Sequence, residues 1–376
     1  MKLSDREWKE FFLEDLFVVK SGKRLTNADK IDGRRPFIGA TDNMNGVTGF
    51  VDNTNNSCDK NVLGVNYNGA PCICFYHPYE CIFTDDVKRL HLKKYKDNSY
   101  VFLFMKAVIM QQKNKYSYGY KFNERRMLRQ LLLVPVDDNN EPDYKFMEDY
   151  IKELMVEKRK QYQEYAERHL MELGIDDKIF GGGYKLDLES KDWKKFNINN
   201  IFFIGHGFYN KKPPMSINGD IPFIGASGAN NGITGFTTIK DIKDNSKVGY
   251  GTNEPLDKKI FSKGHLCVVN NGSAIGYTYY QPNNFTCTHD VNPLWLRNYE
   301  MNKYLGLFLS QMIKNQGICF AYARKWRPSR MVHSCIMLPV DDNNDPDYKF
   351  MEKYGRSVMA KKYVQYLKFL RLEESK

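Results

Sequence analysis

The sequence holds 376 residues, of which 42% are hydrophobic, and its formal net charge at pH 7 is +11. This apolar content is enough for buried cores without disulfide staples, and no apolar run reaches the roughly eighteen residues of a membrane-spanning helix, so no such helix is expected. The first residues, MKLSDREWKEFF, lack a signal-peptide core, so we expect a soluble, cytoplasmic protein. The surplus of positive charge favours a polyanionic partner, and nucleic acid ahead of a membrane surface.

The chain is a duplication. Residues 135–150, PVDDNNEPDYKFMEDY, return as residues 339–354, PVDDNNDPDYKFMEKY, with fourteen of sixteen positions identical. The string PFIGA occurs at 36–40 and again at 222–226. Solenoid repeats have periods of about 20–50 residues, so copies this far apart are domain-sized. The second copy carries about eighteen extra residues within 237–265, rich in turn formers, which predicts a loop.

In chain order, each copy begins with short β-rich runs, at residues 10–95 and 196–298, broken by Asn-Gly turns. A helix is predicted at 98–113 and again at 299–316. A strand, LLLVPV or CIMLPV, follows the helix and leads into the repeated Asp-Asp-Asn-Asn turn. The pattern therefore predicts two similar mixed α and β domains.

A long amphipathic helix is predicted after each copy. The apolar positions of the first helix are Met147, Ile151, Leu154, Tyr162, Tyr165 and Leu173, and those of the second are Met351, Tyr354, Val358, Tyr366, Phe369 and Leu370. About thirty residues span roughly 45 Å, too long for one domain to cover, so we expect the two helices to pair with each other. Gly174 and the glycine tract at 181–183 predict a flexible joint between the copies.

Basic and aromatic residues interleave near the end of each copy. The segment from Tyr116 to Phe122, with arginines at 125, 126 and 129, aligns with Phe320 to Arg327 and Arg330. A second basic turn, with Lys20, Lys23 and Arg24, precedes the first PFIGA and aligns with Tyr209, Lys211 and Lys212. Two aligned segments of this kind indicate contact with phosphates and bases.

The eight cysteines form no CxxC pair, and their positions do not correspond between the copies. A zinc site or a disulfide framework would need such spacing. We therefore expect reduced, mostly buried thiols and no bound metal.

The order of domain, long helix, domain, long helix, with the duplicated PVDDNN(E/D)PDYKFME junction, resembles the specificity subunits of type I restriction-modification systems and of related bipartite-site type II systems. The resemblance covers nearly the whole chain. It implies an α+β fold with two tandem, pseudo-symmetric, β-rich target recognition domains, at 1–142 and 193–346. Helical spacer regions at 143–173 and 347–376, with a linker at 174–192, would then pair as an antiparallel coiled coil.

The resemblance also implies a function. Each domain would read one half of a bipartite double-stranded DNA target, and the helices would dock methyltransferase subunits that carry S-adenosylmethionine, with a restriction subunit as a further partner. No cofactor is expected on this chain itself. The residues that we predict to contact DNA are Lys23, Arg24, Tyr118, Lys121, Arg125 and Arg126 in the first copy, and Lys211, Lys212, Arg324, Lys325, Trp326, Arg327 and Arg330 in the second. Arg126 and Arg330 are matched between the copies, which suits phosphate positioning or a structural role better than discrimination between half-sites.

Two other classes of function compete with DNA recognition. A catalytic methyltransferase would need an Asn-Pro-Pro-Tyr/Phe loop, and the nearest string, Asn292-Pro293-Leu294-Trp295, lacks the second proline. A nuclease site is suggested by Pro142-Asp143-Tyr144-Lys145, but Pro and Asp are common at helix starts. A protein-interaction scaffold without a DNA role would explain the helices and would leave the duplicated basic segments unexplained.

Overall fold

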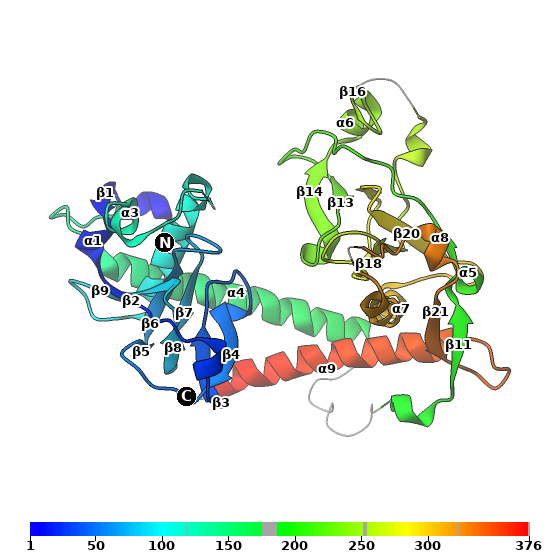
Figure 1. Ribbon diagram of the computed structural model, residues 1–376, viewed down its shortest axis with the longest axis horizontal. Coiled ribbons are helices and arrows are strands. Elements are labelled where there is room, and N and C mark those ends of the chain that lie inside the picture. The colour runs from blue at the N-terminus through cyan, green and yellow to red at the C-terminus, as the bar shows by residue number, and fades with distance from the viewer. Residues whose placement is uncertain (118, 175–185, 251–253, 322, 375–376) are drawn as a thin grey trace. The chain divides into compact units, whose positions relative to one another are not determined.

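A computed structural model describes residues 1–117, 119–174, 186–250, 254–321 and 323–374 (Figure 1). The chain divides into two compact units, Met1–Tyr162 and Gln163–Lys376, called here the first and second unit. The predicted DNA contact Tyr118 and the glycine tract of the predicted joint lie outside the described residues.

The first unit contains two four-stranded sheets and a strand pair. One sheet has the strand order β2-β9-β6-β7 and is antiparallel throughout, and the other has the order β4-β3-β8-β5, in which β3 and β8 run parallel. The strand pair joins β1 near the start of the unit to β10 near its end. The strands are β1 (Trp8–Phe12), β2 (Phe17–Ser21), β3 (Asp32–Ile38), β4 (Val47–Val51), β5 (Cys58–Asp59), β6 (Val62–Asn66), β7 (Cys74–His77), β8 (Cys81–Phe83), β9 (Val87–Leu92) and β10 (Leu131–Pro135), and the helices are α1 (Leu13–Leu16), α2 (Ser99–Met110) and α3 (Glu124–Leu128). Helix α4 (Tyr144–Glu172) begins in the first unit, and its residues from 163 onward belong to the second.

The second unit repeats this plan. Its sheets have the orders β12-β20-β17-β18 and β14-β13-β19, and the pair β11–β21 again brings together the two ends of the repeated domain (Figure 1). The strands of this plan are β11 (Trp193–Asn197), β12 (Phe202–Ile204), β13 (Ile221–Ile224), β14 (Ile233–Thr237), β17 (His265–Val269), β18 (Thr278–Gln281), β19 (Thr286–Cys287), β20 (Val291–Leu296) and β21 (Cys335–Pro339), and the helices are α5 (Ile198–Ile201), α7 (Lys303–Gln316), α8 (Pro328–Met331) and α9 (Tyr348–Glu374).

Helices α2 and α7 confirm the predictions at 98–113 and 299–316, and asparagine side chains fix where they begin. The Asn98 side chain accepts hydrogen bonds from two backbone N–H groups in the first turn of α2, and Asn302 does the same for α7. Such caps satisfy amide groups that have no partner within the helix. Each helix then buries apolar side chains in the main core of its unit.

The duplicated junction has the same geometry in both units. Oδ1 of Asp137 accepts hydrogen bonds from two backbone N–H groups of its turn, at 2.9 and 3.0 Å, and Asp341 repeats both distances. Asp143 and Asp347 then cap α4 and α9 by accepting a bond from the N–H three residues later. The Pro-Asp strings are therefore helix starts, which removes their resemblance to a nuclease site.

The predicted long helices are confirmed as α4 and α9, but part of the predicted apolar stripe is wrong. Within the second unit, Ala166 and Leu170 of α4 pack with a cluster on α9 made by Ala360, Tyr363, Val364 and Leu367. The predicted stripe residues Val358 and Phe369 are exposed instead. Ala166 and Ala360 belong to this buried cluster, and a pattern drawn from the large apolar residues alone did not include them.

The extra segment of the second unit is not the loop that its composition predicts. It contains a six-residue helix, α6 (Ile239–Asp244), followed by a hairpin of β15 (Asn245–Ser246) and β16 (Gly249–Tyr250). Thr238 caps the helix by accepting a hydrogen bond from the N–H of Asp241. A buried Ile242 anchors it, so a local cap and one apolar contact outweigh the turn-forming composition.

All eight cysteines are free thiols, and five of them are buried. Among the described residues no cluster of histidine, cysteine or carboxylate side chains has the geometry to hold a metal ion. None of the described helices combines the length and the apolar character that a bilayer span requires.

Candidate nucleic-acid interface

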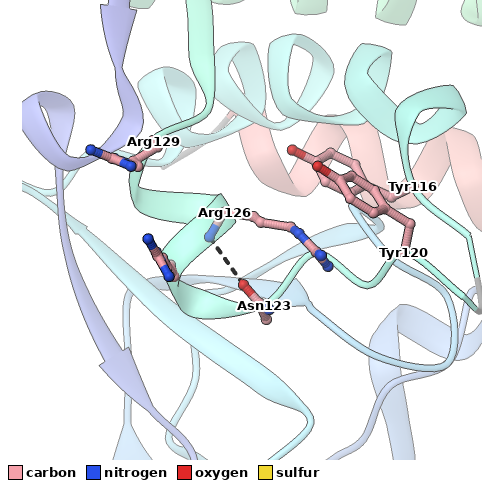
Figure 2. A pocket seen from close by; sticks show the side chains of 6 residues that line it. Tyr116, Tyr120, Asn123, Arg126 and Arg129 are labelled. Carbon is pink, nitrogen blue, oxygen red and sulfur yellow. Dashed lines mark hydrogen bonds between the residues drawn. The ribbon is translucent and has the colours of Figure 1, made fainter.

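The candidate interface of the first unit is built by the turn that leads into α3. A bridge between Ser117 and Tyr120 closes the turn, and the rings of Tyr116 and Tyr120 stack with centroids 5.8 Å apart at 12° (Figure 2). A hydrogen bond fixes the position of the Tyr116 ring, since its hydroxyl donates to Oε1 of Gln130 at 2.7 Å. Burial raises the pKa of Tyr116 to about 12, so the phenol stays neutral.

Arg126 lies against this tyrosine pair. Its guanidinium carbon is 3.8 Å from the centroid of the Tyr120 ring, and Nη1 donates to the carbonyl of Lys121 at 2.9 Å. Asn123 caps α3 by accepting from the N–H of Arg126 at 3.0 Å, as the dashed line in Figure 2 shows. The guanidinium is therefore held in place, yet it keeps donors for a phosphate or a base edge.

These side chains surround an open pocket of about 400 Å³, lined by Tyr116, Tyr120, Asn123, Arg125, Arg126 and Arg129. Figure 2 shows Arg126 directed at the tyrosines and Arg129 directed away from them. An aromatic pair with one guanidinium over it and two more arginines in the pocket lining suits a nucleotide, because it offers stacking for a base and charge for a phosphate.

The second unit has the same scaffold at the equivalent turn. A bridge joins Ala321 to Arg324, and Nη1 of Arg330 donates to the carbonyl of Lys325 at 2.8 Å, as Arg126 does to Lys121. Phe320 stacks on Trp326 with ring centroids 4.8 Å apart at 13°, and the equivalent rings in the first unit, Tyr116 and Phe122, have centroids 4.5 Å apart. The matched arginines thus share a structural role in the two units.

The charges on the two scaffolds differ. Arg125 and Arg129 correspond to Ser329 and His333, whereas Tyr120 and Asn123 correspond to Arg324 and Arg327. In the second unit, Arg324 lies over the Phe320 ring with its guanidinium carbon 5.5 Å from the centroid. The same backbone turn therefore presents its cations at different points, which suits two different half-sites.

The prediction for Trp326 is wrong. Its side chain is fully buried in the core of the second unit, and its indole N–H donates to Oγ of Ser334 at 2.9 Å. Phe122 holds the same position in the first unit and is also fully buried. A tryptophan among cations resembles a stacking platform in sequence, but here it is the apolar support beneath the turn.

The other predicted residues within the described chain lie at the surface, fully or in part. The exposed side chains are those of Lys23, Arg24, Arg125, Lys211, Lys212, Arg324, Arg327 and Arg330, and the half-buried ones are those of Lys121, Arg126 and Lys325. The basic turn of the first unit is tied to α3, because Glu124 accepts hydrogen bonds from Ser21 and from the buried Lys88. The bond from Lys88 lowers the pKa of Glu124, so this link is ionic.

Sequence reasoning omitted four lining residues, Tyr116, Tyr120, Asn123 and Arg129, from the predicted contacts. The tyrosines carry a usable signal, since an aromatic residue beside a cluster of arginines is a recurrent arrangement in nucleic-acid sites. The sequence contained no signal for Asn123, because its role as a helix cap depends on where α3 begins.

The first unit also contains a polar cluster around His91. His91 shares hydrogen bonds with Asp59 at 3.0 Å and Asp97 at 2.7 Å, and Arg89 donates to Asp59 at 2.9 Å. The bond to Asp59 raises the pKa of His91. Burial opposes ionisation of Asp59, but the bond from His91 and the nearby positive charges hold its pKa below the ordinary value.

In the second unit the position of His91 is occupied by Trp295, which stacks on Phe203 with centroids 5.5 Å apart. The outer surface of this sheet is therefore charged in one unit and aromatic in the other.

The chain was compared with known proteins. The family described as Type I restriction modification DNA specificity domain matches it twice, over residues 5–164 and 190–365. The specificity subunit S.BcgI of a type II restriction enzyme from Heyndrickxia coagulans is 56% identical over 149 residues, which are 40% of this chain and 44% of that protein. The match thus spans less than half the length of that relative.

Two solved structures that the chain matches are a type I restriction-modification S subunit from M. genitalium and the HsdS subunit from Thermoanaerobacter tengcongensis. The first has a TM-score of 0.45 at 15% identity and covers 99% of this chain and 94% of its own. The second has a TM-score of 0.31 at 11% identity, with coverages of 97% and 91%.

Proposed function

The chain belongs to the family of type I restriction modification DNA specificity domains and contains two of them, and from this premise we propose that it is a specificity subunit that reads a bipartite DNA target. Each domain reads one half-site. The chain itself supplies recognition, and a separate methyltransferase subunit in the cytoplasm supplies catalysis with S-adenosylmethionine.

One observation carries this proposal: the same arginine-supported turn occurs in both domains with its cations rearranged. The bond from Arg126 to the Lys121 carbonyl is repeated by Arg330 and Lys325, so both turns are held alike. Side chains that are the same at equivalent positions of both domains suit phosphates, which every half-site contains. Side chains that differ between the domains suit base edges. On this view Arg126 and Arg330 position the duplex, while Arg324 and Arg327 read the second half-site.

The long helices fit the role of a spacer. The 29 residues of α4 correspond to about 43 Å, somewhat more than the roughly 34 Å of one DNA turn. We propose that α4 and α9 form an antiparallel coiled coil that fixes the distance between half-sites. The recognition domains would be 1–142 and 193–346, with 174–192 as the linker. Exposed side chains on these helices, such as Val156 and Phe369, would face methyltransferase subunits.

A direct test is equilibrium binding of the full chain, co-expressed with its methyltransferase, to duplexes drawn from a random library. Two short conserved blocks separated by a fixed non-conserved spacer should be enriched. Affinity should also fall steeply with salt, because binding displaces counterions. Enrichment of one continuous block, or none, would refute the proposal.

A further inference from the structure

The extra segment of the second unit, within residues 237–265, carries the hairpin β15–β16, and the described part of the first unit has no such hairpin. We propose that this hairpin is an additional DNA-contacting element used only for the second half-site, and that the buried Lys259 positions it. This inference rests on the proposed DNA-reading function and extends it to residues outside the shared scaffold.

The hairpin is narrow and its tip is exposed. Ser246 pairs with Gly249, so Lys247 and Val248 form a two-residue turn, and Oγ of Ser246 donates to the Gly249 carbonyl at 2.7 Å. The Val248 side chain is 68% exposed. A lysine beside an apolar side chain on a thin β-ribbon suits a DNA groove, where the ammonium meets phosphates and the methyl groups meet sugar or thymine methyl.

The tip is joined to a basic segment that was predicted to contact DNA. The carbonyl of Lys247 accepts hydrogen bonds from the N–H groups of Asn210 at 2.9 Å and Lys211 at 3.2 Å. Lys211 and Lys247 are both exposed, and neither takes part in an ion pair among the described residues. Because the backbones of Lys211 and Lys247 are hydrogen-bonded to each other, both exposed lysines belong to one basic surface, which attracts phosphates.

Lys259 explains how such a short hairpin is held. Its side chain is only 1% exposed, and its ammonium donates to the carbonyls of Ile242 at 3.0 Å and Asn245 at 2.7 Å. These carbonyls lie at the end of α6 and the start of β15, where the helix dipole also favours a cation. The Lys259 carbonyl in turn accepts from Thr286 on β19 at 2.6 Å, which ties the corner to the sheet.

A buried lysine needs such partners, because an uncompensated ammonium is costly in the protein interior. The carbonyls that Lys259 binds belong to α6 and β15, and the described part of the first unit has no matching helix and hairpin, so the shared scaffold gives no other reason for this lysine. Lys259 is therefore a positioning residue, and Lys247 with Val248 is the contact.

The test uses the full chain with its methyltransferase and its own bipartite duplex, with affinity measured over a series of salt concentrations. Lys247→Ala keeps the backbone carbonyl that holds the hairpin. It should weaken binding by roughly fivefold and reduce the salt slope by about one. The matched control is Lys194→Ala, an exposed lysine on β11 outside the proposed surface, which should leave both quantities unchanged.

Lys259→Met should give a loss similar to that of Lys247→Ala, and the two losses should not add, because both act through one hairpin. Wild-type affinity and slope for Lys247→Ala would overturn the inference while leaving the proposed function intact. Loss of methyltransferase co-purification in Lys247→Ala, with DNA affinity unchanged, would overturn it as well and assign the hairpin to protein contact. Failure of the wild-type complex to bind any bipartite duplex would refute the proposed function itself, and the inference with it.

Discussion

At the residue scale, matched side chains support the fold and unmatched side chains carry the differences between the two units. Arg6 forms an ion pair with Asp143 and lies over the Phe146 ring, and Lys191 repeats both contacts with Asp347 and Phe350. These pairs were not visible as pairs in the sequence, because their partners are about 140 to 160 residues apart. Apart from Arg330, which matches Arg126, the exposed arginines of the two turns show no such correspondence.

Arg126→Ala should weaken DNA binding about tenfold, by a similar factor for the cognate duplex and for duplexes with single base changes in the first half-site, because Arg126 is assigned to phosphate. Arg324→Ala should instead reduce discrimination at one position of the second half-site by about 1–3 kcal/mol, because it is assigned to a base edge. Competition binding with single-substitution duplexes distinguishes the two. A position-specific effect of Arg126→Ala would contradict the assignment.

The His91 cluster should make the first unit sensitive to pH. The pKa of His91 is raised in the folded protein, so protonation of His91 stabilises the fold. This stabilisation is complete below the pKa of the unfolded chain, about 6.5, and is lost as the pH rises through the pKa of the folded protein. Asp59, with a lowered pKa, contributes above about 3.9 and loses its effect as pH falls through its folded pKa.

The melting temperature of His91→Gln should therefore fall furthest below wild type between about pH 4 and 6.5, and the gap should narrow above that range. Thermal unfolding of the full chain across pH measures this. Trp295→Phe, at the equivalent position of the second unit, is the control and should show no such pH dependence. A gap that widens as pH rises would contradict the account.

At the element scale, the sequence was informative wherever the two copies could be compared. The junction, α2, α7, α4 and α9 followed from repeated strings and from helical periodicity. The hairpin at 245–250 and the identity of the buried residues on α9 could not be predicted in this way, because both depend on tertiary contacts made by small or charged residues. Trp326 shows the same limit for the site, since only its packing against Phe320 and the core reveals that it is a support.

Gly355 in α9 illustrates such a contact. An added Cβ there would lie 2.5 Å from the carbonyl oxygen of Tyr304 at the start of α7, whereas the first unit has Ile151 at this position, packed against its core. Gly355→Ala gains helix propensity of about 0.5–1 kcal/mol, yet overpacking costs about 1–3 kcal/mol.

The second unit should thus be destabilised by about 1 kcal/mol, measurable by urea unfolding as a shift in midpoint. Lys353→Ala, at an exposed position of the same helix, should be neutral within about 0.5 kcal/mol. Stabilisation by Gly355→Ala would mean that α7 and α9 are not in backbone contact.

At the scale of the whole molecule, two similar domains on one chain suit an asymmetric target. On the proposed function, the shared scaffold determines how each domain binds DNA, and the surface residues that differ determine which sequence it reads. If α4 and α9 act as the spacer, then lengthening both by seven residues, two helical turns, should lengthen the spacer of the target by about 10.5 Å, or roughly three base pairs. Methylation-motif sequencing of the lengthened variant tests this, and an unchanged spacer in an active complex would refute the ruler role.

The central claim, that this chain specifies a bipartite DNA target, is tested most directly by single-molecule methylome sequencing of a host strain with and without this gene. The account predicts the loss of one bipartite adenine-methylation motif, with two unlike half-sites and a fixed spacer, and no change elsewhere. An unchanged methylome, with the partner methyltransferase expressed and active, would contradict it.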